Sequence, residues 1–354
     1  MPFDIDIIQR GLQQTAYKAE VGKPVDTFLS SSLFGGAPIM GNPVDGVISY
    51  NFRRKSAMLA DEAIFGADPN RVNFDTGFDT KFLKPAVFND ENVVDWHSGN
   101  RRVFAEGLEQ SLTPEARIIT VAADVRDRIA DMHNMSKEKM AADMLLTGKV
   151  TVKDGGEQAM PISSSLLNVS GATLYTKPVE TILGALKAIR KVNKGASGVK
   201  AIIMNFDDAM NLVLALGELG YKDSDKFELA SITFQDFTAN GAMYMGRLIC
   251  GGVCEIYGYA GEYNANGAVS SYIPQGKAIV LTQPTVGSFG YGVVMAATAQ
   301  GFGAPMLAME RTTLYTMGSG DNMNLHVQRQ TSPLPIVTAI DSYAVLTGIP
   351  ASRS

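Results

Sequence analysis

The longest regular pattern of hydrophobic and polar residues in this chain lies between Thr113 and Gly148. Hydrophobic side chains recur there mostly at spacings of three and four, as on one face of an amphipathic helix. They are Ile118, Val121, Ala122, Val125, Ile129, Met132, Met140 and Met144. The opposite face carries charges of both signs, at Arg117, Asp124, Arg126, Asp127, Arg128, Asp131, Lys137, Glu138, Lys139 and Asp143. Thr113 suits the N-cap, Pro114 the first helical position and Gly148 the residue after the helix.

The pattern therefore predicts one helix over residues 114–147, about 51 Å long at 1.5 Å per residue. The average helix of a globular protein has only roughly 11–12 residues. A one-sided helix of this length is typical of a beam that supports a larger assembly, and it is rarely a catalytic device.

Two regions before this helix are less regular. Residues 1–45 have a weak hydrophobic pattern broken by glycines and prolines, which predicts an extended arm with little core of its own. Residues 46–92 predict a long β-hairpin. Its strands are expected at 47–52 and 82–88, and Asp68-Pro69-Asn70 is a favourable turn.

The arm and the hairpin carry candidate contacts to other proteins. The arm contributes hydrophobic side chains that need a surface to cover, namely Phe28, Leu29, Leu33, Phe34 and Ile39. The hairpin contributes the cations Arg53, Arg54, Lys55, Arg71, Lys81 and Lys84 and the aromatic side chains Phe74, Phe78 and Phe82. A solvated loop, or a tail that touches its own domain, is the simpler alternative. The phenylalanines could also stack on single-stranded nucleic acid, but the acidic chain favours docking on protein.

After the long helix, strands and helices alternate. The expected elements are a strand at 149–153, a helix at 179–192, a buried strand at 199–204, a helix at 206–219, and strands at 229–234, 247–259, 278–281, 324–329 and 333–340. This order indicates an α+β protein with a mixed region after the helix.

Composition narrows the class of protein. The 354 residues are 45% hydrophobic with a mean hydropathy of +0.03, which is ample for packed cores. A net charge of −5 disfavours a protein that binds nucleic acid by neutralising phosphates. The sequence has no apolar run long enough for a transmembrane helix, and Asp4 and Asp6 disfavour a signal peptide. Two cysteines indicate synthesis in a reducing cytoplasm without a disulfide framework.

The residues that usually carry chemistry do not form a recognisable site. The histidines His97, His133 and His326 are isolated in sequence, and a packed or half-exposed structural role is expected for the latter two. Cys250 and Cys254 lack the further ligands of a zinc site, so they are expected to be buried strand residues. The glycine-rich loop at 287–292 lacks the lysine of a phosphate-binding loop. No catalytic residue, cofactor or metal site is predicted.

The order of arm, hairpin, long helix, mixed region and returning strand resembles the lambda-type major capsid proteins of tailed phages, the major capsid protein E family. These proteins share the Hong Kong 97-type capsid fold. Three motifs carry the resemblance. They are Gln330-Thr331-Ser332-Pro333-Leu334-Pro335-Ile336 with Asp341 and Tyr343, then Gly258-Tyr259-Ala260-Gly261-Glu262-Tyr263 with the stretch from Tyr272 to Leu281, and Arg117 to Gly148 ending in Leu145-Leu146-Thr147-Gly148-Lys149.

The resemblance implies a division of the chain. It consists of an N-terminal arm (1–45), an E-loop hairpin (46–92), a P-domain (93–175) that contains the spine helix 114–147, an A-domain (176–310), a returning P-domain strand (311–332), and a closing A-domain strand and tail (333–354). Arm and E-loop would make the contacts between subunits, through Phe28, Leu29, Phe34, Arg53, Arg54, Arg71, Phe74, Phe78, Lys81 and Phe82.

The function that the resemblance implies is geometric rather than catalytic. Copies of the chain would form the hexamers and pentamers of an icosahedral shell that encloses double-stranded DNA without reading its sequence. A scaffolding protein, a portal and a decoration protein are the expected partners, and assembly is expected in the host bacterial cytoplasm, with no membrane and no cofactor.

Three alternatives stay open. An encapsulin-like compartment would share the fold and enclose enzymes. An enzyme with Cys254 as nucleophile and a distant histidine as base would need a reactive thiol of low pKa. A glycan- or surface-binding virion protein would remain a small soluble oligomer.

Overall fold

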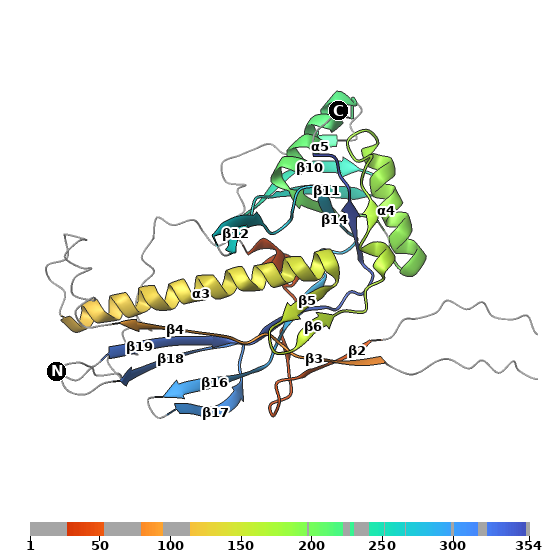
Figure 1. The fold of residues 1–354 in the computed structure, drawn as a ribbon. Coiled ribbons are helices and arrows are strands. Elements are labelled where there is room, and N and C mark those ends of the chain that lie inside the picture. The colour runs from red at the N-terminus through yellow and green to blue at the C-terminus, as the bar shows by residue number, and fades with distance from the viewer. Residues whose placement is uncertain are drawn as a thin grey trace, which may run out of the picture.

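The computed structural model describes residues 27–52, 79–94, 114–196, 198–221, 227–229, 241–250, 252–265, 267–298, 301–317 and 324–351. One long helix, α3 (Pro114–Thr147), lies between an upper sheet with two helices and a lower group of strands (Figure 1). The predicted helix is confirmed. Gly148 follows it with a φ of 71°, the left-handed conformation that a glycine adopts after a helix. Thr113 lies outside the described residues. Within the described ranges, no helix combines the length and apolar character needed to cross a membrane.

Below α3 lies an antiparallel sheet. Its strand order is β18 (Glu310–Met317), β19 (Asn324–Thr331) and β4 (Phe88–Val94). The hydrophobic stripe in the first half of α3 packs on this sheet, and the buried residues are Val94, Ile118, Ala122, Ala123, Val125, Ile129, Leu314, Leu325 and Val327. A hairpin of β16 (Val293–Thr298) and β17 (Gly301–Leu307) lies beside it (Figure 1). The strand expected at 324–329 is confirmed as β19.

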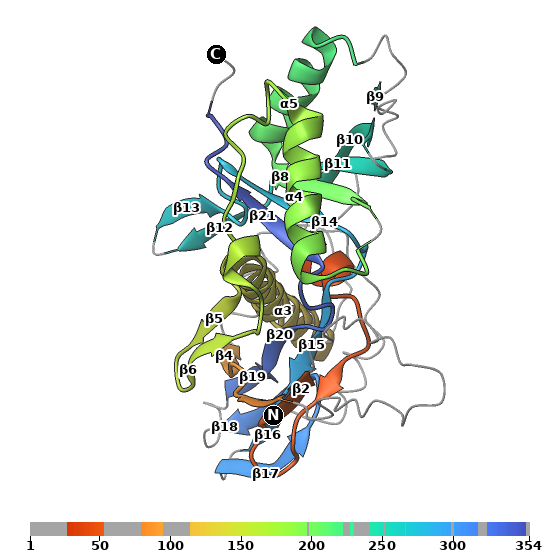
Figure 2. The ribbon, with the colours of Figure 1, turned by 90° about the vertical axis from the view of Figure 1, so that its right-hand side faces the viewer.

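Above α3 lies a seven-stranded mixed sheet. Its order is β7 (Val169–Ser170), β21 (Tyr343–Thr347), β14 (Lys277–Leu281), β8 (Ala201–Asn205), β11 (Val253–Tyr259), β10 (Ala242–Ile249) and β9 (Phe227–Leu229). The helices α4 (Pro178–Val192) and α5 (Phe206–Glu218) cover one face, and the other face meets the C-terminal part of α3 (Figure 2). Alternate residues of β8 show this division, because Ile202 and Met204 join the helix-side core whereas Ile203 joins the α3-side core.

Most elements expected in this region are confirmed, with small shifts at their ends. The single strand expected at 247–259 is wrong, because β10 and β11 form an antiparallel hairpin there. Where the two strands connect, the Cys250 N–H donates to the Gly252 carbonyl at 3.0 Å, and Gly252 has a φ of 147°, a conformation that favours glycine. The strand expected at 229–234 lies largely outside the described residues.

The chain leaves the upper sheet after Leu281, earlier than the predicted end of the A-domain at residue 310. β15 (Gly287–Tyr291) instead lies between β1 (Ile39–Met40) and β20 (Pro333–Val337) in a three-stranded sheet. The run expected as one closing strand is therefore two strands, β20 and β21, in different sheets. The remaining elements are the hairpins β5–β6 (Lys149–Val152, Gly156–Ala159) and β12–β13 (Glu262–Ala265, Ala268–Ser271) and the short turn η2 (Ser164–Leu166).

The hairpin region begins as predicted and then diverges. β2 (Ile48–Phe52) pairs antiparallel with β3 (Asp79–Leu83), and residues 53–78 lie outside the described residues. The second strand was expected to run through Pro85 to Phe88. Proline has no N–H for a strand ladder, so β3 ends before Pro85, and β4 pairs with β19 below the helix.

The arm differs more from its prediction. Residues 28–34 form a π-helical turn, η1 (Leu29–Leu33), wedged between α3 and the upper sheet, with Phe28, Leu29 and Phe34 buried inside the subunit. The expectation that these three side chains cover a neighbouring subunit is therefore wrong. Leu29 and Leu33 are four residues apart and share one face of the turn, so this turn fills a gap in the core of its own subunit.

Candidate functional site

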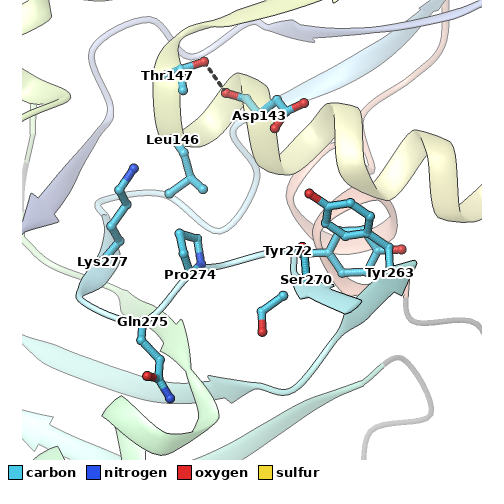
Figure 3. Close-up of a pocket in the computed structure, with 10 residues that line it drawn as sticks. Asp143, Leu146, Thr147, Tyr263, Ser270, Tyr272, Pro274, Gln275 and Lys277 are labelled. Carbon is cyan, nitrogen blue, oxygen red and sulfur yellow. Dashed lines mark hydrogen bonds between the residues drawn. The ribbon is translucent and has the colours of Figure 1, made fainter. Parts of the chain in front are cut away.

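A groove on the described surface has no catalytic arrangement. It has a volume of about 550 Å³ and lies between the last turns of α3 and the β12–β13 hairpin (Figure 3). Its lining consists of Asp143, Leu146, Thr147, Tyr263, Ser270, Ser271, Tyr272, Pro274, Gln275 and Lys277. Among these, Asp143 is the only carboxylate, and it accepts a hydrogen bond from Lys139 at 2.5 Å. Lys277 lies on the opposite side of this view from Tyr263 and Tyr272 (Figure 3). No nucleophile is paired with a base there, and no metal-binding cluster occurs among the described residues.

The cysteines are buried at the β10–β11 turn, as predicted. The hydrogen bond shared with Cys250, together with burial, raises the pKa of Cys254 well above its usual range. Cys254 is therefore held as the neutral thiol, whereas a nucleophile needs an accessible thiolate.

We expect iodoacetamide to label neither cysteine rapidly in the native protein. Labelling requires opening of the upper-sheet core, so its rate should be lower by about a hundredfold or more than in urea-unfolded protein. Mass spectrometry of labelled peptides measures both rates. Rapid native labelling of Cys254 would contradict its assigned environment and favour the cysteine-enzyme alternative.

The two described histidines connect strand β4 to its neighbours. Nε2 of buried His133 on α3 lies 2.8 Å from Oδ2 of Asp90, and burial lowers the pKa of His133 against the opposing effect of Asp90. His326 on β19 hydrogen-bonds Glu91, and this bond lowers the pKa of Glu91. The expected structural role of both histidines is confirmed, and His97 lies outside the described residues.

The paired strands β2 and β3 form a stem, and hydrogen bonds to strand β6 anchor this stem to the rest of the subunit. Oε1 of buried Gln158, on β6, accepts a hydrogen bond from the Lys84 N–H at 2.9 Å. Nζ of Lys81 donates to the Ala159 carbonyl at 3.3 Å. Phe82 projects from the same stem and is 72% exposed. An exposed aromatic ring on an anchored strand is the kind of side chain that anchors protein interfaces.

A buried carboxylate joins three distant segments of the chain. Oε1 of Glu138, on α3, accepts hydrogen bonds from the Leu29 N–H at 2.7 Å and from the Tyr259 hydroxyl at 2.6 Å. Its Oε2 accepts a hydrogen bond from the Ser30 N–H at 2.8 Å. Glu138 has no exposed surface. Its expected place on the solvated face of the helix is therefore wrong, and it lies where η1, α3 and β11 meet.

The environment of Glu138 has opposing effects on its ionisation. Burial raises the pKa of its carboxyl, and the hydrogen bonds from Ser30, Tyr259 and Leu29 oppose this rise without cancelling it. Within the described part of the chain, no cation pairs with it. Buried charges without a partner ion are costly. The contact is thus better suited to fixing a position than to adding stability.

The raised pKa predicts a specific pH dependence. The folded protein holds the Glu138 proton more tightly than the unfolded chain does, so this contribution is fully present below pH 4.5 and is lost as pH rises through the folded pKa. The free energy of unfolding of the wild type minus that of Glu138→Gln should therefore fall as pH rises from 4.5, and then level off. Urea titrations of both proteins across this range measure the difference, and a difference that rises with pH would contradict the assignment.

The predicted contact residues divide into three groups. Arg53, Arg54, Arg71, Phe74 and Phe78 lie outside the described residues. Lys81 and Phe82 lie together on the stem, and Phe28, Leu29 and Phe34 lie in the core. Of the described contact residues, those on the stem are therefore available to another subunit, whereas those of the arm turn are buried within their own subunit.

Comparisons with known proteins agree with this fold. The sequence matches the family described as phage major capsid protein E over residues 68–347. The structure is similar to the prophage capsid protein of Escherichia coli CFT073 at 14% identity and a TM-score of 0.52, covering 77% of this chain and 80% of that one.

Two further solved structures are weaker matches. They are the SrpI encapsulin of Synechococcus elongatus PCC 7942 (12% identity, TM-score 0.46, 100% and 98% of the two chains) and the capsid of cyanophage A-1(L) (12%, 0.46, 95% and 98%). No curated protein matches the sequence. The family match spans most of the chain and the fold is the Hong Kong 97 type, so the chain belongs to the phage major capsid protein E family.

Proposed function

We propose that this chain is the shell subunit that forms hexamers and pentamers around double-stranded DNA. Membership of a major capsid family carries the shell function. The division of the subunit supports the finer proposal: a rigid body is built on one long helix, and the β2–β3 hairpin reaches out from it on an anchored stem. A rigid body with a reaching element lets identical chains tile a surface.

The parts of the subunit take the following roles in this proposal. Residues 46–92 act as the E-loop, the helix and the lower sheet form the P-domain, and the seven-stranded sheet with α4 and α5 forms the A-domain. Phe82 and Lys81 of the stem, together with Arg53, Arg54, Arg71, Phe74 and Phe78, contact the adjacent subunit. A scaffolding protein, a portal and a decoration protein are the proposed partners, with assembly in the host bacterial cytoplasm and release as part of the virion.

The net charge of the chain supports a shell that encloses DNA without binding it tightly. With a net charge of −5, the subunit does not neutralise DNA phosphates as a binding protein does. The lining of the groove and the buried cysteines likewise offer no catalytic site in the described ranges. A shell subunit needs neither DNA binding through phosphate neutralisation nor a catalytic site.

Electron microscopy of the expressed protein tests the proposal. Closed shells are expected from the chain alone or after co-expression with its scaffolding partner, and the nuclease sensitivity and absorbance of purified particles report whether nucleic acid is inside. Monomers under every assembly condition would contradict the shell function. Shells that enclose only protein would favour the encapsulin-like alternative.

A further inference from the structure

The arm turn is held at its two ends by different contacts. On its later side, the Leu33 carbonyl accepts a hydrogen bond from the Val286 N–H at 2.8 Å, and the Phe34 ring packs on Phe289 with centroids 5.7 Å apart. These contacts involve the three-stranded lower sheet or the segment leading into it. On its earlier side, the polar anchors of the turn are the two hydrogen bonds from Leu29 and Ser30 to Glu138.

The chemistry of Glu138 fits this early end. Consecutive N–H groups at the start of a helical turn have no partners within the turn, and a carboxylate can accept both at once. A glutamine has only one acceptor oxygen, so its amide nitrogen, which is a donor, would face one of the N–H groups. The third bond comes from the Tyr259 hydroxyl on β11, so the same carboxylate also fixes the upper sheet. The Phe28 ring closes the site against Tyr257 and Tyr259, with centroids 5.7 and 5.8 Å away.

The turn also holds Thr27, the residue that precedes it. The Thr27 carbonyl accepts hydrogen bonds from the Ser31 N–H at 2.9 Å, from the Ser31 hydroxyl at 2.6 Å and from the Ser30 hydroxyl at 3.1 Å. Thr27 is thus held by the residues that Glu138 holds.

We propose that Glu138 is a positioning residue that locks the arm turn in one register against the long helix and the upper sheet. The lock holds the turn and strand β11 of the upper sheet in one position relative to the long helix, and copies of the subunit need this fixed arrangement to form shells of one size. The local lock is a property of the single subunit, whereas its effect on shell size rests on the proposed shell function.

Hydrogen–deuterium exchange of the full-length unassembled chain tests the lock directly. In Glu138→Gln and Glu138→Ala, peptides that contain Leu29 and Ser30 should exchange about ten- to a hundredfold faster, the loss expected for hydrogen bonds to a charged group. Peptides across Val286 and α4 should keep their wild-type rates. Tyr259→Phe, which removes one donor and keeps the carboxylate, should show a smaller local increase. Glu180→Gln is the matched control, because Glu180 is an exposed helical glutamate paired with Lys177.

The outcomes separate the lock from the shell function. Unchanged exchange at Leu29 and Ser30 would overturn the proposal, as would loss of protection throughout the upper sheet in the Glu138 variants and in Tyr259→Phe. Electron microscopy of the same variants should show particles of mixed size or open sheets. Uniform shells of wild-type size, despite faster exchange, would overturn the effect on shell size. If the wild type forms no shells, the proposed function fails, and the exchange data still decide the lock.

Discussion

Replacing residues 53–78 with a short turn is expected to leave a folded subunit that forms no closed shells. The stem strands remain, and Ile48 and Leu83 at their body end are almost fully buried, so the core keeps its packing. The deletion removes five residues that are proposed to contact the neighbouring subunit, namely Arg53, Arg54, Arg71, Phe74 and Phe78. The melting temperature and circular dichroism should stay close to those of the wild type, while electron microscopy and light scattering should show only subunits or small oligomers.

A second variant separates the hairpin tip from its stem. Phe82→Ser keeps residues 53–78 and removes one exposed ring, so assembly should weaken without disappearing. Loss of folding in the deletion variant would place the segment in the core and end the E-loop assignment. Regular shells from the deletion variant would show that subunit contacts lie elsewhere.

The long helix was predictable because local signals agree along its whole length. Its hydrophobic period, Pro114 and the left-handed Gly148 all mark the same element, and its observed bounds match the expected ones. The strand β8 was predictable because the uninterrupted apolar run 201–204 needs cover on both faces. Pro85 illustrates the opposite case. The break it causes in the strand was visible in the sequence, but the partner that β4 takes after the break is set by distant β19.

The docking of the turn η1 could not be predicted from local pattern. Its hydrophobic residues are too few to show a period, so their burial depends on a gap formed by segments more than a hundred residues away. One signal could have pointed to Glu138. The last turns of α3 are apolar on more than one side, through Met140, Ala141, Ala142, Met144, Leu145 and Leu146. A helix end that is apolar on more than one side packs against more than one neighbour, so a nearby glutamate was a candidate for a buried acceptor.

The glycine at position 287 should tolerate no side chain. It lies in β15, the central strand of the three-stranded sheet, and a Cβ there would come within 2.1 Å of the Ile336 carbonyl oxygen and 3.0 Å of the Phe34 ring. The nearest obstacle is backbone of the paired strand β20, which cannot rotate away. Gly287→Ala should therefore cost about 3 kcal/mol or more of unfolding free energy, at or above the upper end for overpacked sites. Urea unfolding followed by circular dichroism measures it.

Gly184→Ala is the matched control with the opposite expected sign. Gly184 lies within α4, and nothing comes within 4 Å of the position a Cβ would take. Alanine restricts the unfolded chain more than glycine does, so the variant should be more stable by about 0.5–1 kcal/mol. Both variants make the same chemical change, so the sign of each effect depends on local geometry alone. If Gly287→Ala were as stable as the wild type, β15 and β20 could not pair as closely as described. The arm turn, whose Phe34 packs against the same strand, would then lose its fixed support.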